Sequence, residues 1–214
     1  MKTPILSIIL FFIVLVGYCQ KGTAVYYENQ TRISKNDLKS IPQMLRDEMA
    51  KDVNSHKSQS VLNLQGNTNL YHFKGTDFTK KDDNLKNIKN ETNGAAIVGS
   101  SIEVNSKELK FIKNIKKNNY LTKVNGKLVS TPLPKAIWKF TNKIKKIAGY
   151  NCYEATTTFK KHKLTAFFTK ELNIKGSPDT LPFLDGVILE YSYSRFYVKA
   201  VKVELNVPII TNFL

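Results

Sequence analysis

Short runs in which apolar and polar residues alternate occupy most of the chain after residue 20. Such alternation, with many β-branched and aromatic residues in the runs, is typical of β-strands with one buried face. Gly66-Asn67 and Asn125-Gly126 separate neighbouring runs, and such pairs supply the positive φ angles that a tight hairpin turn needs. The strands expected in the first two thirds of the chain are 22–30, 58–65, 69–74, 109–115, 119–124 and 128–131.

The last third of the chain reads as one nearly uninterrupted series of strands. Ala166-Phe167-Phe168 is apolar at consecutive positions, which indicates a strand covered on both faces. We therefore expect a mainly β fold of the α+β class, in which a curved antiparallel sheet resembles an open barrel or bowl and one helix packs against it. The strands expected here are 137–140, 143–150, 152–159, 164–169, 186–193 and 196–205.

One segment has helical periodicity instead. Met44, Leu45, Met49 and Val53 recur at three- and four-residue steps, and Ser40 is placed to cap the helix N-terminus. We expect this helix over about residues 40–54, at the mouth or on the concave side of the sheet. Residues 75–107 are rich in Lys, Asp and Asn, and this composition predicts a polar loop or mobile insertion.

The first 19 residues have the three parts of a secretory signal peptide. Lys2 precedes an apolar run from Ile5 to Val16, and small residues precede a cleavage site between Cys19 and Gln20. The run is shorter than the roughly 20 apolar residues that span a bilayer, and the bulky Tyr18 disfavours the alternative in which Cys19 is lipidated. We expect a signal peptide at 1–19, a single β domain at 20–214, and export to the periplasm or cell surface.

The chain is strongly basic, with a formal net charge of +16. Only three of its 33 cationic residues are arginines, whereas phosphate-binding proteins favour the bidentate guanidinium group of arginine. We interpret the charge first as a solvated lysine-rich surface and second as a means of attracting an anionic envelope partner. No binding to nucleic acid is expected.

The sequence offers few sets of residues for metal binding or nucleophilic catalysis. His56, His72 and His162 are far apart in the sequence, and none has the spacing of a metal ligand pair. After cleavage of the signal peptide, Cys152 is the one remaining thiol, and we expect it in the core. No cofactor and no metal site are predicted.

Two groups of residues in the last third are candidates for a functional site. A hydrolase would have to use Glu171, Asp179 or Asp185, which lie near the turns between residues 169 and 186. Aromatic residues gather in the final strands, where they form either a packed core or a groove that binds a hydrophobic or saccharide ligand. The candidate ligand-binding residues among them are Phe167, Tyr191, Tyr193 and Tyr197.

From Trp138 to Glu190 the chain resembles the GLPGLI family of exported flavobacterial-type proteins. The motif that names the family falls on residues 183–189, with Phe183 and Asp185 in place of a glycine and the proline. The resemblance implies an exported, mostly antiparallel β protein of uncharacterised activity, without catalytic residues. The residues that carry it are Trp138, Gly149, Tyr150, Cys152, Ala155, Gly176, Pro178, Gly186, Ile188 and Leu189.

The leading functional hypothesis is a non-enzymatic periplasmic or cell-surface module that binds an envelope component through the concave face of its sheet. The partner could be an outer-membrane protein or an anionic or hydrophobic envelope component. Two alternatives stay open. One is an accessory or scaffold protein of an outer-membrane complex, and the other is a carboxylate-dependent hydrolase.

Overall fold

The computed structural model describes residues 21–39, 43–81, 90–92, 95–98 and 101–214. The expected signal peptide, its cleavage site at Cys19 and Gln20, and the expected helix cap Ser40 lie outside the described residues. None of the described helices is long and apolar enough to cross a bilayer.

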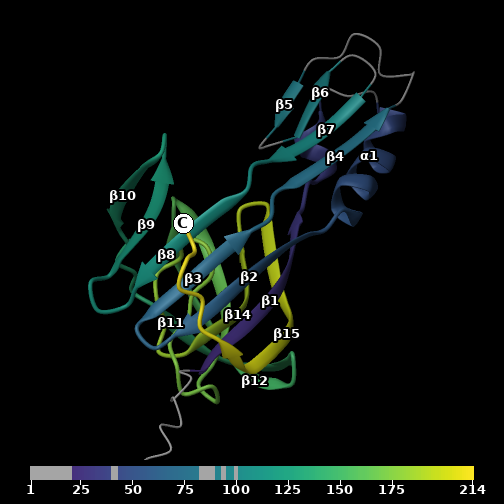
Figure 1. Ribbon diagram of the computed structural model, residues 1–214. Helices are drawn as coiled ribbons and strands as arrows, with labels where there is room; N and C mark the ends of the chain where they lie inside the picture. The colour runs from purple at the N-terminus through teal and green to yellow at the C-terminus, as the bar shows by residue number, and fades with distance from the viewer. Residues whose placement is uncertain (1–20, 40–42, 82–89, 93–94, 99–100) are drawn as a thin grey trace, which may run out of the picture.

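A large antiparallel sheet of eleven strands forms the body of the molecule (Figure 1). Its strands follow the order β10-β9-β8-β3-β2-β1-β15-β14-β13-β12-β11, so the sheet is open and ends at β10 and β11. The expected curved antiparallel sheet is confirmed. Its strands are β1 (Lys21–Thr31), β2 (Ser58–Gln65), β3 (Thr68–Phe73), β8 (Leu109–Asn114), β9 (Asn119–Val124), β10 (Lys127–Pro132), β11 (Lys139–Ile147), β12 (Tyr150–Phe159), β13 (His162–Thr169), β14 (Val187–Tyr193) and β15 (Phe196–Pro208).

The strands lie close to their expected positions, with one difference. Residues 137–140 and 143–150 were expected to form two strands, whereas one strand, β11, includes parts of both segments, and its pairing with β12 is irregular between Phe140 and Ile144. The turn between β9 and β10 has positive φ at both Asn125 (49°) and Gly126 (77°). Two consecutive positive φ angles give the hairpin turn whose twist matches that of the strands it joins.

A second, four-stranded sheet lies beyond one end of the large sheet (Figure 1). Residues 75–107 were expected to form a polar loop or mobile insertion, but they carry strands paired in the order β4-β7-β6-β5. The polar composition of this segment did not predict these strands, because the hydrogen bonds of an antiparallel sheet join backbone groups and can form between polar residues as well as apolar ones. The division into signal peptide and single domain stays a prediction. The strands are β4 (Thr76–Lys81), β5 (Asn90–Thr92), β6 (Ala95–Val98) and β7 (Ser101–Ser106).

The helix α1 (Gln43–Ser55) lies at the end of β1, on the same side as the small sheet (Figure 1). A short 3-10 helix, η1 (Lys35–Leu38), connects the two elements. Met49 and Val53 of α1 are buried, as the periodicity predicts. The Asn54 side chain accepts a hydrogen bond from the Ile33 amide (2.8 Å) and donates one to the Ile33 carbonyl (3.0 Å), which fixes the helix beside the mouth of the sheet.

The long connection between β13 and β14, residues 170–186, fills much of the space between the two halves of the curved sheet. Ser177 and Leu181 in this connection are fully buried. The Asn69 side chain of β3 donates to the Lys175 carbonyl and accepts from the Ser177 amide. On the other side, the Trp138 indole donates to the Phe183 carbonyl (3.1 Å). We call residues 170–186 the inner loop.

Gly186 ends the inner loop where no side chain fits. Its φ is +153°, and a Cβ placed there would lie 2.3 Å from the Thr169 carbonyl oxygen. We expect Gly186→Ala to lower the free energy of unfolding by more than about 2 kcal/mol, measured by urea titration. The control is Gly126→Ala, which also has a positive φ but no atom within 4 Å, with an expected loss of about 1 kcal/mol. Equal losses for both variants would contradict this explanation.

Candidate functional site at the mouth of the sheet

A buried lysine holds the inner loop in place. The Lys113 side chain of β8 is fully buried, and its Nζ donates hydrogen bonds to the Ser177 carbonyl (2.6 Å), the Ser177 hydroxyl (2.9 Å) and the Leu181 carbonyl (3.1 Å). It also lies 4.8 Å from the centre of the Phe183 ring. Burial lowers the pKa of Lys113 to about 7. Its contacts fix the stretch of loop that carries Asp179 and Thr180.

Asp179 and Thr180 line a cavity of about 360 Å³ at the mouth of the sheet, near the end of α1. Val53 of α1 and His56, which follows the helix, also line this mouth cavity, together with the start of β2 and the ends of several other strands. Asp179 has a positive φ of 49°, a conformation that Asp and Asn tolerate better than most residues. Six other lining residues are aromatic and carry Phe or Tyr rings: Tyr71, Phe73, Phe111, Tyr191, Tyr193 and Phe196.

The rings in this wall pack on one another, and their hydroxyls stay protonated. Tyr71 and Phe111 stack with centroids 6.1 Å apart, and Tyr191 and Tyr193 do the same at 6.1 Å. Burial raises the pKa of Tyr71, Tyr191 and Tyr193, and the nearby Asp179 carboxylate raises each of them further. The site therefore combines an acceptor carboxylate, phenolic donors and apolar ring faces, the composition of a small-molecule pocket.

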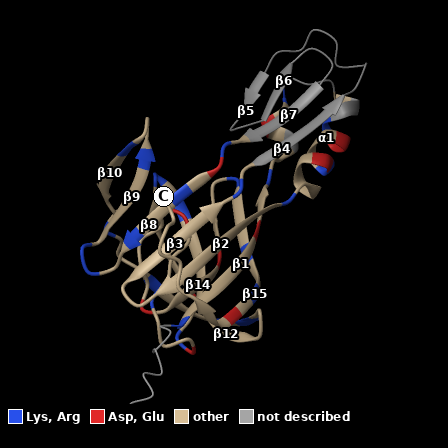
Figure 2. Ribbon diagram, in the orientation of Figure 1, with Lys and Arg blue, Asp and Glu red and all other residues tan. Residues whose placement is uncertain are grey.

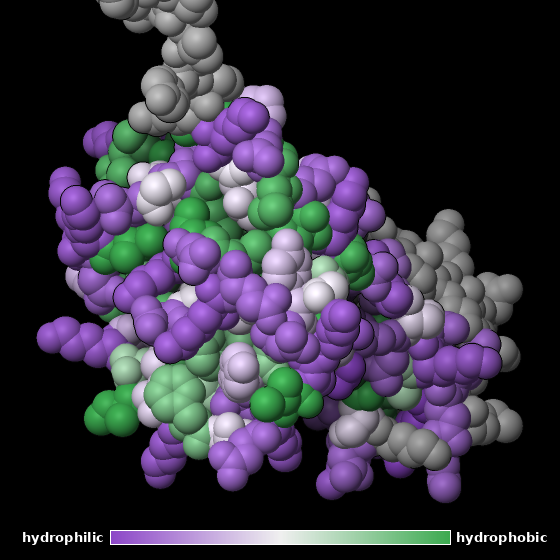
Figure 3. Space-filling view, turned by 90° about the horizontal axis from the view of Figure 1, so that it is seen from below, coloured by the Kyte–Doolittle hydropathy of each residue, from purple (hydrophilic) through white to green (hydrophobic). Residues whose placement is uncertain are grey.

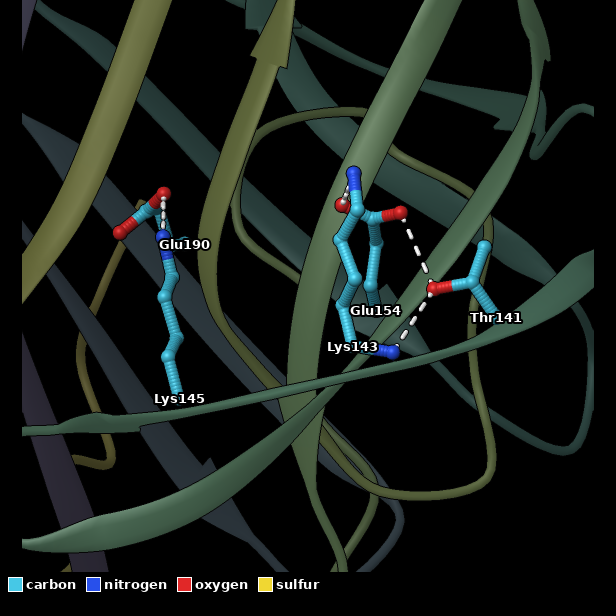
Figure 4. A network of polar contacts seen from close by, with 5 residues as sticks. All are labelled: Thr141, Lys143, Lys145, Glu154 and Glu190. Atoms are coloured by element: carbon cyan, nitrogen blue, oxygen red, sulfur yellow. Dashed lines mark hydrogen bonds and ion pairs between the residues drawn. The ribbon is translucent and has the colours of Figure 1, made fainter.

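A second polar cluster lies on the opposite face of the sheet, around two buried carboxylates (Figure 4). Lys145 of β11 forms an ion pair with Glu190 of β14. Glu154 of β12 accepts a hydrogen bond from the Thr141 hydroxyl (3.0 Å) and pairs with Lys143 (3.5 Å). Residue pairing places Phe167 between the two glutamates. Because both carboxylates are buried and paired with lysines of the edge strand, this cluster holds β11 in place, and the mouth cavity is the better candidate for a ligand.

The sequence-predicted aromatic candidates divide between the two faces. Tyr191 and Tyr193 line the mouth cavity. Phe167 and Tyr197 do not, because alternation along β13 and β15 turns them to the other face: Phe167 pairs with Glu190, and Tyr197 pairs with Ser192. There the Lys145 ammonium lies over the Phe167 ring (3.9 Å) and the Arg32 guanidinium lies over the Tyr197 ring (3.6 Å).

The three candidate carboxylates of the inner loop do not share one site. Asp179 lines the mouth cavity, whereas Asp185 is exposed and pairs with Lys170 (3.2 Å) and Lys175 (3.0 Å). Glu171 is also exposed and accepts a hydrogen bond from the Asn151 amide (3.1 Å).

Cys152 is buried, and burial raises the pKa of its thiol to about 12. His56 lines the mouth cavity and His72 contacts Glu108 (2.5 Å). Among the described residues, no three His, Cys, Asp or Glu side chains gather as metal ligands would.

Lys113 and Thr180 were not among the sequence-predicted candidates, whereas Phe196 belongs to the aromatic residues that gather in the final strands. Lys113 had a detectable signal, because alternation places it on the same face of β8 as the buried Phe111. A charged residue on the apolar face of a strand indicates a buried partner. Nothing comparable marks Thr180, because the path of the inner loop, which brings it to the cavity, depends on contacts between residues far apart in the sequence.

The lysines lie on many separate segments of the described ribbon instead of one stripe (Figure 2). Seen from below, hydrophilic side chains cover most of the surface, with apolar patches between them (Figure 3). This distribution agrees with the interpretation of the net charge as a solvated surface.

Comparison with known proteins decides the family. The model of the family described as "N-glycanase peptide, N-terminal domain" matches residues 76–211, more than half of the chain. The chain belongs to this N-glycanase N-terminal domain family. No curated protein matches the chain. Two solved structures of PNGF-II, in space groups P21 and C2, share the fold with TM-scores of 0.53 and 0.52 at 16% and 18% identity.

The match covers 86% of this chain but 28% of each PNGF-II chain. Most of this chain thus shares its fold with a part of PNGF-II, while the chain spans about 28% of the length of the solved structures it matches.

The resemblance to the GLPGLI family is wrong, because the N-glycanase N-terminal domain family covers the same residues, 138–190. The residues that suggested it serve general needs of a packed β-sheet. Gly149 has a positive φ in the β11–β12 turn, Gly176 packs on Leu64, and Trp138 caps a carbonyl of the inner loop. The hypothesis of a non-enzymatic envelope-binding module is also wrong, because the family is that of an N-glycanase domain. The scaffold alternative is wrong for the same reason.

Lys113 should make stability depend on pH. Between pH 7 and about 10.5, the unfolded chain keeps a proton on this lysine that the folded chain releases. Folding therefore becomes more favourable as the pH rises through this window and less favourable as it falls. We expect the difference in unfolding free energy between the wild type and Lys113→Met to grow by up to about 1 kcal/mol per pH unit, measured by urea titration at pH 7, 8 and 9.

The difference in unfolding free energy between the wild type and Lys113→Met removes the pH dependence of groups that both proteins share, including Cys152 and the buried tyrosines. Parallel pH profiles for the two proteins would show that Lys113 has the same pKa in the folded and unfolded chains.

Removing Lys145 should leave Glu190 buried without its cation. We expect Lys145→Met to lower the free energy of unfolding by roughly 3 kcal/mol, and Lys145→Met with Glu190→Leu to restore most of the loss. The control is Lys57→Met, which removes a lysine from the exposed pair with Glu28 and should cost less than about 1 kcal/mol. A double variant no more stable than Lys145→Met would contradict the assignment of the pair.

Proposed function

We propose that this chain acts outside the cytoplasm in the enzymatic release of N-linked glycans, and that its part is to hold the glycosylated substrate in the mouth cavity. The observation that carries this proposal is the match to the N-glycanase N-terminal domain family over residues 76–211. That range contains the floor of the cavity at Asp179 and Thr180 and its wall at Tyr191, Tyr193 and Phe196.

Substrate binding suits the mouth cavity better than bond cleavage does. Asp179 is the one carboxylate among the described residues that line it. Acid–base chemistry on a glycan or its amide linkage commonly uses two titratable groups whose pKa values are pushed apart. Aromatic rings around a few convergent polar groups, by contrast, are what a pocket needs to hold and orient a ligand. The signal peptide expected at residues 1–19 supports action outside the cytoplasm.

The test measures glycan release from an N-glycoprotein by mass spectrometry. The reaction contains the full chain, the catalytic region of an N-glycanase without its N-terminal domain, or both. We expect the rate with both to exceed the rate with the catalytic region alone severalfold. Asp179→Asn should lose this gain, because Asn keeps the size and tolerates the positive φ but removes the charge.

Asp185→Asn is the matched control, because Asp185 lies on the same loop but is exposed and outside the mouth cavity. It should keep the full gain. Binding of an N-glycopeptide to the full chain is measured by calorimetry alongside. No gain in rate, together with no preference for the glycopeptide over the bare peptide, would overturn the proposal.

A further inference from the structure

The mouth cavity has the dimensions of a small ligand. Its volume of about 360 Å³ lies at the lower end of the roughly 300–1,000 Å³ typical of ligand pockets. Such a space takes one or two sugar rings and cannot enclose a branched glycan. The part of a glycan that enters it must therefore be small.

The floor of the cavity supplies hydrogen-bonding groups for a polyhydroxylated ligand. The two oxygens of the Asp179 carboxylate can accept hydrogen bonds from two adjacent hydroxyls at once. Beside it, the Thr180 Oγ1 is buried and has no hydrogen-bond partner in the protein. Buried polar groups without partners are uncommon, and one that lines a cavity indicates a ligand or water that supplies the missing bond.

The rim supplies a flat apolar surface. Phe196 is 43% exposed and lines the cavity, and its ring lies 5.4 Å from that of Tyr193. A partly exposed aromatic ring that is supported by a second ring is held in place to receive the apolar face of a ligand. The same cavity thus offers ring stacking at its rim and a carboxylate at its floor.

A cationic ligand is the main competitor, since aromatic rings and a carboxylate also bind ammonium groups. Two observations argue against it. Lys160 also lines the cavity, and the chain carries a net charge of +16, so the surrounding field repels cations. A quaternary ammonium group also cannot bond to Thr180, whereas a sugar hydroxyl can.

We propose that the mouth cavity binds one neutral pyranose ring of the glycan, with two adjacent hydroxyls on the Asp179 carboxylate and the apolar face of the ring on Phe196. This inference rests on the proposed function and adds which part of the substrate the cavity holds. The cavity thereby binds one sugar ring, while the peptide and the rest of the glycan stay outside the cavity.

Competition for a labelled N-glycopeptide tests this inference, with the full chain and three small probes. Methyl α-mannoside carries a neutral ring with adjacent hydroxyls, mannitol carries similar hydroxyls without a ring, and tetramethylammonium is a bare cation. We expect methyl α-mannoside alone to displace the glycopeptide. Asp179→Asn should weaken its binding by at least about tenfold, and Phe196→Leu by roughly three- to tenfold.

Two matched variants keep these losses interpretable. Asp185→Asn changes an exposed aspartate outside the cavity, and Phe140→Leu changes a phenylalanine that is 65% exposed and lies on β11. Both should bind methyl α-mannoside as the wild type does. Equal losses in these controls would overturn the assignment of Asp179 and Phe196.

The outcomes separate this inference from the function on which it rests. If the glycopeptide binds but mannitol competes as well as the mannoside, or tetramethylammonium alone competes, the pyranose inference is wrong while the proposed function stands. If the glycopeptide does not bind at all, the proposed function is wrong as well.

Discussion

The hydrogen bonds from the Lys113 Nζ to Ser177 and Leu181 are the interaction on which the rest of the structure depends. A sheet of eleven strands that curves without closing leaves a concave space, and the inner loop packs there against large buried side chains of the strands. Such a loop brings backbone carbonyls into the interior, where unpaired polar groups are costly. One lysine satisfies two of these carbonyls and a hydroxyl, and so makes a buried loop possible.

The loop also decides where a ligand can bind. By filling the lower part of the concave space, it leaves a cavity at the mouth and places Asp179 and Thr180 on its floor. On the opposite face, β11 brings two lysines against Glu154 and Glu190, and these ion pairs occupy the two buried carboxylates. The molecule thus has one polar cluster that stabilises an edge strand and another that is open to a ligand. Lys113 in the core holds the same loop that carries Asp179 into the cavity.

The strands were largely predictable because their signals are local. Alternation placed nearly all strands of the large sheet, and Asn125-Gly126 marked its hairpin. The candidate site was predictable only in part, because it depends on the register between distant strands and on the path of a loop. Tyr191 was identified, but Phe167 was assigned with it although strand pairing turns Phe167 to the other face. The resemblance to the GLPGLI family was wrong because the glycines and the tryptophan of this chain that suggested it serve packing needs that many β-sheets share.

The most direct measurement of the central claim follows backbone amide resonances of the isotopically labelled full chain while an N-glycopeptide is added. If the inner loop presents the ligand site, the largest changes in chemical shift should occur at Asp179, Thr180 and Phe196, with small changes on β11. Largest changes around the β11 cluster of Lys143 and Lys145, or no changes at saturating glycopeptide, would contradict the account.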